Sequence, residues 1–167
     1  MQQASQTRPQ LDVRLIVNGR PHELRIEPRQ TLAEVLRGPL GLTGTKVSCD
    51  SQVCGTCTVL VDGLTVSSCT YLAADAHDRE VTTVEGLANP DTGELTVLQQ
   101  SFIDHAAFQC GFCTPGFLIT ATALLEETPR PTREQVIEGL EGNICRCTGY
   151  QQIIDAVMTA AERSASS

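Results

Sequence analysis

Aromatic residues are scarce in this sequence, so a large hydrophobic core is hard to build from it. The 167 residues include no tryptophan, and aromatic residues make up 4% of the chain. A chain of this length fits one domain, but two units of modest size also fit. Each of two such units would have a thin core, so a bound metal would add much to its stability.

Basic charge and long apolar runs are also lacking, and this excludes two kinds of partner. The formal net charge is −8, and the twelve Lys and Arg residues are scattered, whereas nucleic-acid binding needs a basic patch. The richest apolar stretch, residues 117–125, is short and broken by threonines, and a membrane span needs about 18 apolar residues. The acidity suits a redox protein that docks to a partner, and it equally suits an ordinary soluble surface.

Cysteine, in contrast, is abundant, because the chain contains eight. A disulfide framework would need a secretory context, and the first ten residues have neither an apolar core nor a cleavage site. We therefore expect a cytoplasmic protein. In a reducing compartment, clustered thiols bind metal more often than they pair with each other.

Two β-hairpins and a short helix are predicted in the first half of the chain. In each hairpin, apolar and polar residues alternate on both sides of a two-residue turn, at residues 11–26 and 58–67. Thr31 and Glu34 form a capping box for the helix between the hairpins. With a further strand at residues 81–84, these elements make a small α+β unit.

Helical periodicity dominates the second half. Thr132 and Gln135 offer another capping box. Apolar residues also recur at three- or four-residue steps in three stripes: Leu95, Leu98, Phe102 and Ala106; Phe117, Ala121, Leu124 and Leu125; and Ile153, Ile154, Val157, Met158 and Ala161. Four helices suggest a bundle. The predicted fold class is α+β, with a first unit at residues 11–85, a connector at 86–94 and a helical unit at 95–163.

The first cysteine set has the spacing of an iron–sulfur ligand loop. Cys49, Cys54 and Cys57 stand as C-x4-C-x2-C, which is typical of plant-type [2Fe–2S] sites. The register of the second hairpin puts Cys57 opposite Ser68 and therefore beside Cys69, the predicted fourth ligand. Zinc is the alternative metal, but zinc sites usually have two short C-x2-C knuckles, and this set has one.

Two glycines lie near this first set. Gly55 stands between two predicted ligands, where a glycine would let backbone amides approach the sulfur atoms, and we assign it to the cluster loop. Gly44 fits this role and an ordinary turn equally well.

The second cysteine set consists of two pairs, CGFC and CRC, that each precede a predicted helix. They are Cys110 with Cys113, and Cys145 with Cys147. Free amides at a helix N-terminus stabilise thiolates, so two such ends would suit a cluster. A thioredoxin-like pair is disfavoured because helices flank it on both sides, whereas zinc stays open. Arg146 either offsets cluster charge or is an ordinary surface residue.

No catalytic site of the chain's own is visible. His22, His77 and His105 have no ligand-like spacing, and we assign them no role. The sequence also has no nucleophile elbow and no zinc-protease helix motif.

Three segments together resemble a known family. They are residues 49–59, CDSQVCGTCTV; residues 109–116, QCGFCTPG; and residues 142–150, GNICRCTGY. In this order they are similar to the small iron–sulfur subunit of molybdenum hydroxylases, the xanthine oxidase family. The resemblance extends over about residues 11–163, and no position departs from the ligand pattern.

The resemblance implies a β-grasp, ferredoxin-like domain followed by a four-helix domain, each with one [2Fe–2S] cluster. It also implies two partner subunits: a large one with a molybdopterin, expected in the cytosine dinucleotide form, that hydroxylates the substrate, and a medium one with FAD. We therefore expect a heterotrimer, or a dimer of heterotrimers, in which this chain is the non-catalytic electron carrier.

The same resemblance gives an order for the clusters. The one on Cys110, Cys113, Cys145 and Cys147 would lie near the molybdenum, and the one on Cys49, Cys54, Cys57 and Cys69 would lie nearer the flavin. Gln109 and Cys147 would lie close to the pterin. The substrate gives up two electrons and each cluster accepts one, so two clusters in series allow stepwise transfer.

The substrate class is expected to be an N-heterocyclic aromatic or purine-like compound, with carbon monoxide or an aldehyde as alternatives. Two other classes of function remain open. One is a free-standing two-cluster electron carrier that docks transiently with its partners. The other is an interaction module stabilised by zinc.

Overall fold

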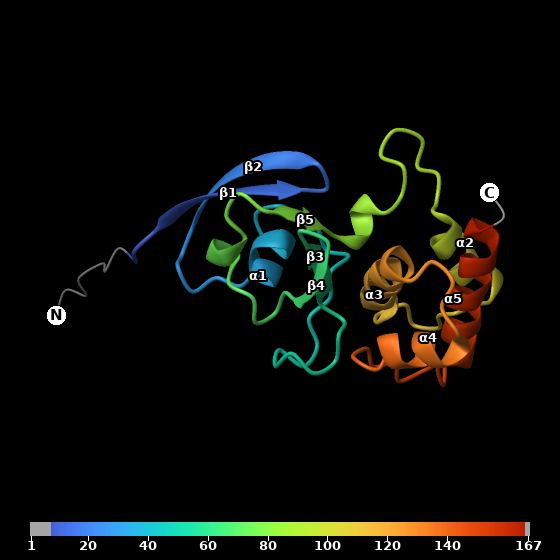
Figure 1. Ribbon diagram of the computed structural model, residues 1–167. Helices are drawn as coiled ribbons and strands as arrows, with labels where there is room; N and C mark the ends of the chain where they lie inside the picture. The colour runs from blue at the N-terminus through green and yellow to red at the C-terminus, as the bar shows by residue number, and fades with distance from the viewer. Residues whose placement is uncertain (1–7, 166–167) are drawn as a thin grey trace.

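A five-stranded sheet and a group of helices lie next to each other in the structure (Figure 1). The structure is a computed structural model that describes residues 8–165. The sheet and its helix α1 are formed by the first half of the chain, and helices α2 to α5 by the second half. The predicted α+β class is confirmed at this level.

Both predicted hairpins are confirmed and form the two edges of the sheet. The strand order is β2-β1-β5-β3-β4. In both turns the central residues have the positive φ angles of a tight hairpin turn: Asn18 (50°) with Gly19 (75°), and Asp62 (50°) with Gly63 (81°). The strands are β1 Leu11–Val17, β2 Arg20–Ile26, β3 Thr58–Val61, β4 Leu64–Ser67 and β5 Glu80–Thr82.

Helix α1, Leu32–Arg37, begins at the predicted capping box. The Glu34 amide donates to Thr31 Oγ1 at 3.3 Å, and the Thr31 amide donates to Glu34 Oε2 at 2.8 Å. A short 3-10 helix, η1 Ala73–Ala76, packs against α1. Apolar side chains of the helices and strands form one core: Val13, Leu15, Val17, Ile26, Leu32, Val35, Leu36, Val59, Val61, Ala73, Ala76 and Val81.

The prediction of a strand at residues 81–84 is wrong about where that strand ends. Strand β5 stops at Thr82, and Val84–Gly86 forms a second 3-10 helix, η2. The Thr83 amide donates to Asn18 Oδ1 at 2.9 Å rather than to a neighbouring strand, so the ladder cannot continue. Val84 then packs against the helical core.

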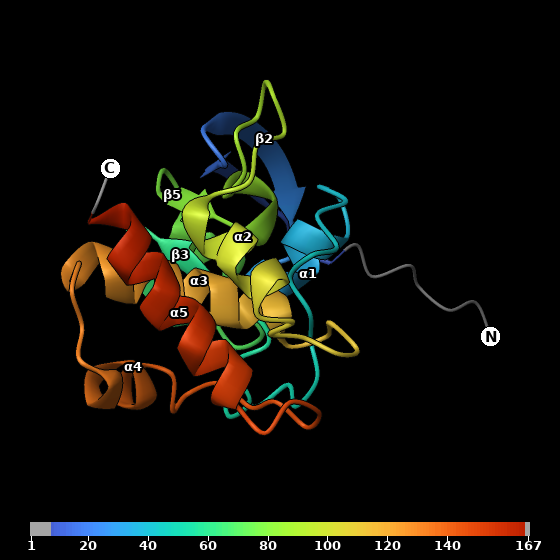
Figure 2. The same cartoon turned by 90° about the vertical axis from the view of Figure 1, so that its right-hand side faces the viewer.

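The helices of the second half enclose a separate core, with α5 packed against α2 and α4 (Figure 2). The helices are α2 Val97–Asp104, α3 Thr114–Glu127, α4 Arg133–Gly139 and α5 Gln151–Ser164. Their core consists of Leu98, Phe102, Ala107, Cys113, Phe117, Leu118, Ala121, Val136, Leu140, Cys145, Ile153, Ala156, Val157 and Ala160. The apolar faces that the periodicity predicts for α3 and for α5 both contribute to this core.

The first helix of this half, α2, is shorter than the apolar stripe from Leu95 to Ala106 that predicted it. A capping box of Thr96 and Gln99 begins α2, so Leu95 precedes the helix and is exposed. Ala106 follows the helix with a φ of 46°. The capping box at Thr132 and Gln135 is present as predicted.

The two halves meet where α3 lies against β3 and β4 (Figure 1). This contact brings the start of α3 close to the loop that precedes β3. Within residues 8–165, no helix is both long and apolar enough to cross a membrane.

Candidate metal centres

The first cysteine group lies where the loop after α1 meets the second hairpin. Strands β3 and β4 pair in the predicted register, and the Ser68 amide donates to the Cys57 carbonyl at 3.4 Å. This pairing places Cys69 beside Cys57. Three of the four thiols, including both of these, are buried, and Cys49 is half-buried.

Backbone amides of the loop point at the sulfur of Cys49. The amides of Val53 and Cys54 each donate to Cys49 Sγ at 3.4 Å. A hydrogen bond from the Ser51 side chain, together with backbone amides of the same loop, lowers the pKa of Cys49 to about 6. The loop therefore stabilises a thiolate before any metal binds.

The pKa of Cys57 is shifted upward, in the opposite direction to that of Cys49. Burial, together with repulsion from the nearby thiols of Cys69 and Cys54, raises the pKa of Cys57 to about 11. Thiols this close oppose each other's ionisation, and a metal ion bound among them would supply the compensating positive charge.

The loop curls through several left-handed residues. Asp50 (φ 53°), Gln52 (φ 63°) and Gly55 (φ 66°) all have positive φ, which turns successive amides toward one side. A side chain at Gly55 would also overlap the Gly142 carbonyl. The assignment of Gly55 to this loop therefore has a geometric basis.

Gly44 has a different role. Its amide donates to Glu85 Oε1 at 2.7 Å, and an added Cβ would come within 2.5 Å of Val84 Cγ1. The small size of Gly44 lets the start of η2 pack against the loop after α1, and this contact needs no metal.

The second cysteine group joins two interhelical loops. Cys110 and Cys113 lie between α2 and α3, and Cys145 and Cys147 lie between α4 and α5. Cys147 Sγ is 3.6 Å from Cys110 Sγ. Two of the four thiols, Cys113 and Cys145, are buried, and the other two are exposed.

The pKa shifts in this group follow burial and local donors. Burial raises the pKa of Cys113 to about 12, and the adjacent Cys145 thiol adds to the effect. Burial also opposes ionisation of Cys145, but the Thr148 hydroxyl (3.1 Å) and amide (3.4 Å) donate to its sulfur and lower the pKa overall. The Cys110 thiol raises the pKa of Cys147.

Both pairs precede a helix, as predicted, but at different distances from it. Cys113 is the N-cap residue of α3. Helix α5 begins after Tyr150, so Cys147 lies further from the helix end, and Thr148 rather than the helix supplies the donors to Cys145. Arg146, between the two cysteines, is exposed.

The structure brings the two residues predicted near a pterin together. Gln109 Nε2 donates to the Cys147 carbonyl at 3.2 Å, and both residues are exposed. Large apolar side chains near these thiols in the chain are also exposed, namely Phe108, Phe112, Ile144 and Tyr150. The exposed thiols therefore belong to a surface that an apolar partner could cover.

Two residues that sequence reasoning did not single out also support this group. The Cys145 amide donates to the Tyr150 hydroxyl at 3.1 Å. The hydroxyl of Thr114, directly after Cys113, is buried and has no hydrogen-bond partner within residues 8–165. A buried hydroxyl without a partner is costly, and a cluster sulfur would accept its hydrogen bond. The motif contained both residues but not their contacts.

The cysteines of each predicted set thus lie near one another, with Cys57 beside Cys69 and Cys54 in the first and Cys110 beside Cys147 in the second. No group of three or more His, Cys, Asp or Glu residues in the described part of the chain forms a ready site for one metal ion. His77 and His105 lie outside both sets and hydrogen bond with Arg14 and Thr159.

Comparison with known proteins identifies two iron–sulfur domains. A family model described as a 2Fe-2S iron-sulfur cluster binding domain matches residues 15–88. A second, described as a [2Fe-2S] binding domain, matches residues 83–158.

Whole relatives match nearly from end to end. The nicotine 6-hydroxylase small subunit of Paenarthrobacter nicotinovorans is 52% identical over 153 residues, covering 92% of this chain and 90% of the relative. The nicotinate dehydrogenase small FeS subunit of Eubacterium barkeri is 42% identical, covering 93% and 98%. Among solved structures, a chain of quinoline 2-oxidoreductase from Pseudomonas putida 86 superposes with a TM-score of 0.89 at 46% identity, covering 94% and 97%.

Proposed function

The chain belongs to the iron–sulfur small subunits of the molybdenum hydroxylases, and from this premise we propose that its eight cysteines hold two [2Fe–2S] clusters in series. It is a non-catalytic subunit of an oxidoreductase. The observation that supports the proposal is the closeness of thiols within each group, with N–H and O–H donors aimed at the sulfur atoms of Cys49 and Cys145. When bound, each cluster accepts and releases one electron.

The ligands are assigned by half. The first cluster belongs to residues 11–85 and the second to residues 95–163, with 86–94 as connector, and we propose that α2 to α5 form a four-helix bundle around their common core. The proposed ligands are Cys49, Cys54, Cys57 and Cys69 for the first cluster, and Cys110, Cys113, Cys145 and Cys147 for the second.

The exposure of the second group supports an order for electron transfer. Cys110 and Cys147 are exposed on an apolar surface, as expected for the group that meets a molybdopterin in a large subunit. Gln109 and Cys147, joined by their hydrogen bond, would contact the pterin. Electrons would leave through the first group toward FAD in a medium subunit, next to Val53, which is 63% exposed.

The names of the relatives support a substrate class. Nicotine, nicotinate and quinoline, named for three similar proteins, are N-heterocyclic aromatic compounds. We propose such a compound as substrate of the assembled enzyme, a cytoplasmic heterotrimer or dimer of heterotrimers with the cytosine dinucleotide form of the cofactor. The alternative is an aldehyde, because the chain is also 42% identical to an aldehyde oxidoreductase.

The test is metal analysis and spectroscopy of the chain, prepared anaerobically with iron and sulfide. We expect equal amounts of iron and acid-labile sulfide, and two distinct paramagnetic signals after reduction with dithionite. A colourless, silent protein would overturn the proposal, and zinc without sulfide would favour the zinc-stabilised module. Purification from the native source should also retain a molybdenum-containing chain and a flavoprotein, whereas recovery of the chain alone would favour a free-standing carrier.

A further inference from the structure

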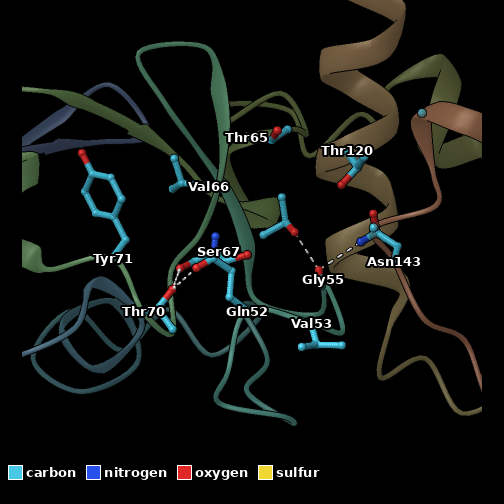
Figure 3. A pocket seen from close by; sticks show the side chains of 13 residues that line it. Gln52, Val53, Gly55, Thr65, Val66, Ser67, Thr70, Tyr71, Thr120 and Asn143 are labelled. Carbon is cyan, nitrogen blue, oxygen red and sulfur yellow. Dashed lines mark hydrogen bonds between the residues drawn. The ribbon is translucent and has the colours of Figure 1, made fainter.

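Three hydrogen-bond donors converge on the carbonyl oxygen of Gly55. This oxygen accepts hydrogen bonds from the Asn143 side chain (Nδ2, 3.0 Å) and from the hydroxyl and amide of Thr58 (2.7 and 3.2 Å). Figure 3 shows the bond between Asn143 and Gly55. Thr58 belongs to the same half as Gly55, whereas Asn143 is 88 residues away and belongs to the other half. The Asn143 side chain therefore ties the two halves together.

The backbones at this point are in direct contact. A side chain at Gly116, in the first turn of α3, would overlap the Gly55 carbonyl, and one at Gly55 would overlap the Gly142 carbonyl. The Ile144 amide also donates to the Cys54 carbonyl at 3.0 Å. Only glycines allow so close an approach.

The junction joins a residue inside the first cysteine group to a residue inside the second. Gly55 directly follows Cys54 of the first group, and Asn143 precedes Cys145 of the second by two positions. A movement at this point would therefore shift one ligand loop relative to the other.

Beside the junction a pocket of about 500 Å³ lies between the halves, with Val66 and Ser67 of β4 on one side and Thr120 and Asn143 on the other (Figure 3). Asn143, at 4% exposed, is a buried polar side chain whose amide nitrogen donates to the carbonyl of the other half. Buried amides are retained at such places when their hydrogen bond fixes one arrangement.

We propose that Asn143 is a positioning residue that sets the separation of the two [2Fe–2S] clusters by holding the Gly55 carbonyl. This inference rests on the proposed function. In the step it serves, one electron leaves the reduced cluster of the second group and reduces the cluster of the first group, with no proton transferred. The rate of that step depends on the separation of the clusters.

The test is paramagnetic resonance of the full chain with both clusters reduced, in Asn143→Ala and the unaltered protein. Two nearby paramagnetic clusters split or broaden each other's signals, and the effect weakens with distance. Thr58 still satisfies the Gly55 oxygen in the variant, so the first loop should keep its fold and both clusters should assemble. We expect a weaker mutual splitting, and a several-fold slower electron transfer between the clusters in the assembled enzyme.

Thr58→Val is the matched control, because it removes a hydrogen bond to the same oxygen from within one half. It should leave the mutual splitting unchanged. Equal splitting in Asn143→Ala and the unaltered chain would overturn the inference, and so would loss of a cluster in Asn143→Ala, because Asn143 would then act on assembly. Absence of clusters from the unaltered chain would instead overturn the proposed function.

Discussion

The two cysteine groups differ in how they are built and in how far they are open to the surface. The first uses one loop and the hairpin that follows it, between Cys49 and Cys69, and most of its thiols are buried. The second joins two loops that are separated by α3 and α4, and two of its thiols are exposed.

This difference indicates a division of labour. A loop whose own amides bond to sulfur needs no other chain to complete it. The second group has donors to sulfur from Thr148 alone among the contacts described above and leaves Cys110 and Cys147 at the surface, so a partner subunit would complete its cover. The group that is open to a partner is also the better placed to receive its electrons.

The largest expected effect comes from replacing a buried ligand in either group. Cys113→Ser and Cys57→Ser should each remove one cluster, because a buried hydroxyl is a poor substitute for a thiolate. Since each half has its own core, the other cluster should remain, and bound iron and sulfide should fall by half. Each variant serves as the control for the other, and loss of both signals in one variant would show that the groups are not independent.

A smaller effect should separate the groups by their exposure. When the isolated chain is treated with a chelator, the second cluster should be lost several-fold faster, because Cys110 and Cys147 are exposed and the first group is mostly buried. The decay of the two paramagnetic signals would be followed over time. The difference should shrink in the assembled enzyme. Equal decay in the isolated chain would contradict the division of labour described above.

What could be predicted from the sequence was local. Hairpin turns, capping boxes and cysteine spacings depend on residues a few positions apart, and the register of β3 with β4 followed from one turn. The strand end at Thr82 was not predictable, because it depends on Asn18 across the sheet.

The site was predictable to the same extent. Spacing identified the eight thiols, and the resemblance added Gln109, but neither indicates which thiols are buried. The bond from Asn143 to Gly55 joins residues 88 positions apart, and the unpaired hydroxyl of Thr114 results from packing. Contacts of this kind exist only once both halves are folded together.

Thr114→Val should change the reduction potential of the second cluster but not that of the first, which would distinguish the two groups. A donor to sulfur stabilises the reduced, more negative state, so its loss should lower the potential. A hydrogen bond of about 1 kcal/mol corresponds to on the order of 40 mV for one electron. A redox titration would measure both clusters, and only the second should shift.

Thr122→Val is the control for this change, because the Thr122 hydroxyl, also on α3, donates to the Leu118 carbonyl at 2.8 Å. It should leave both potentials in place. An unchanged second potential in Thr114→Val would mean that the buried hydroxyl does not face the cluster.

The smallest effect concerns an ion pair within the helical half. Asp155 of α5 accepts from Arg133 of α4 at 2.8 Å, and the Arg133 guanidinium, followed by the Gln151 amide, lowers the pKa of Asp155 below its usual 3.8. A carboxylate with a lowered pKa contributes stability at neutral pH and loses it as the pH falls through that pKa. Asp155→Asn should therefore slightly lower the urea midpoint of helix unfolding at pH 7, and the difference from the unaltered chain should begin to shrink near pH 4 and vanish once the pH is below the lowered pKa. Asp12→Asn is the control, because Asp12 and Arg25 form an exposed ion pair in the sheet, with the charged atoms 4.0 Å apart. This control should not change the urea midpoint at either pH. If the difference for Asp155→Asn persists in acid, packing rather than charge joins α4 to α5.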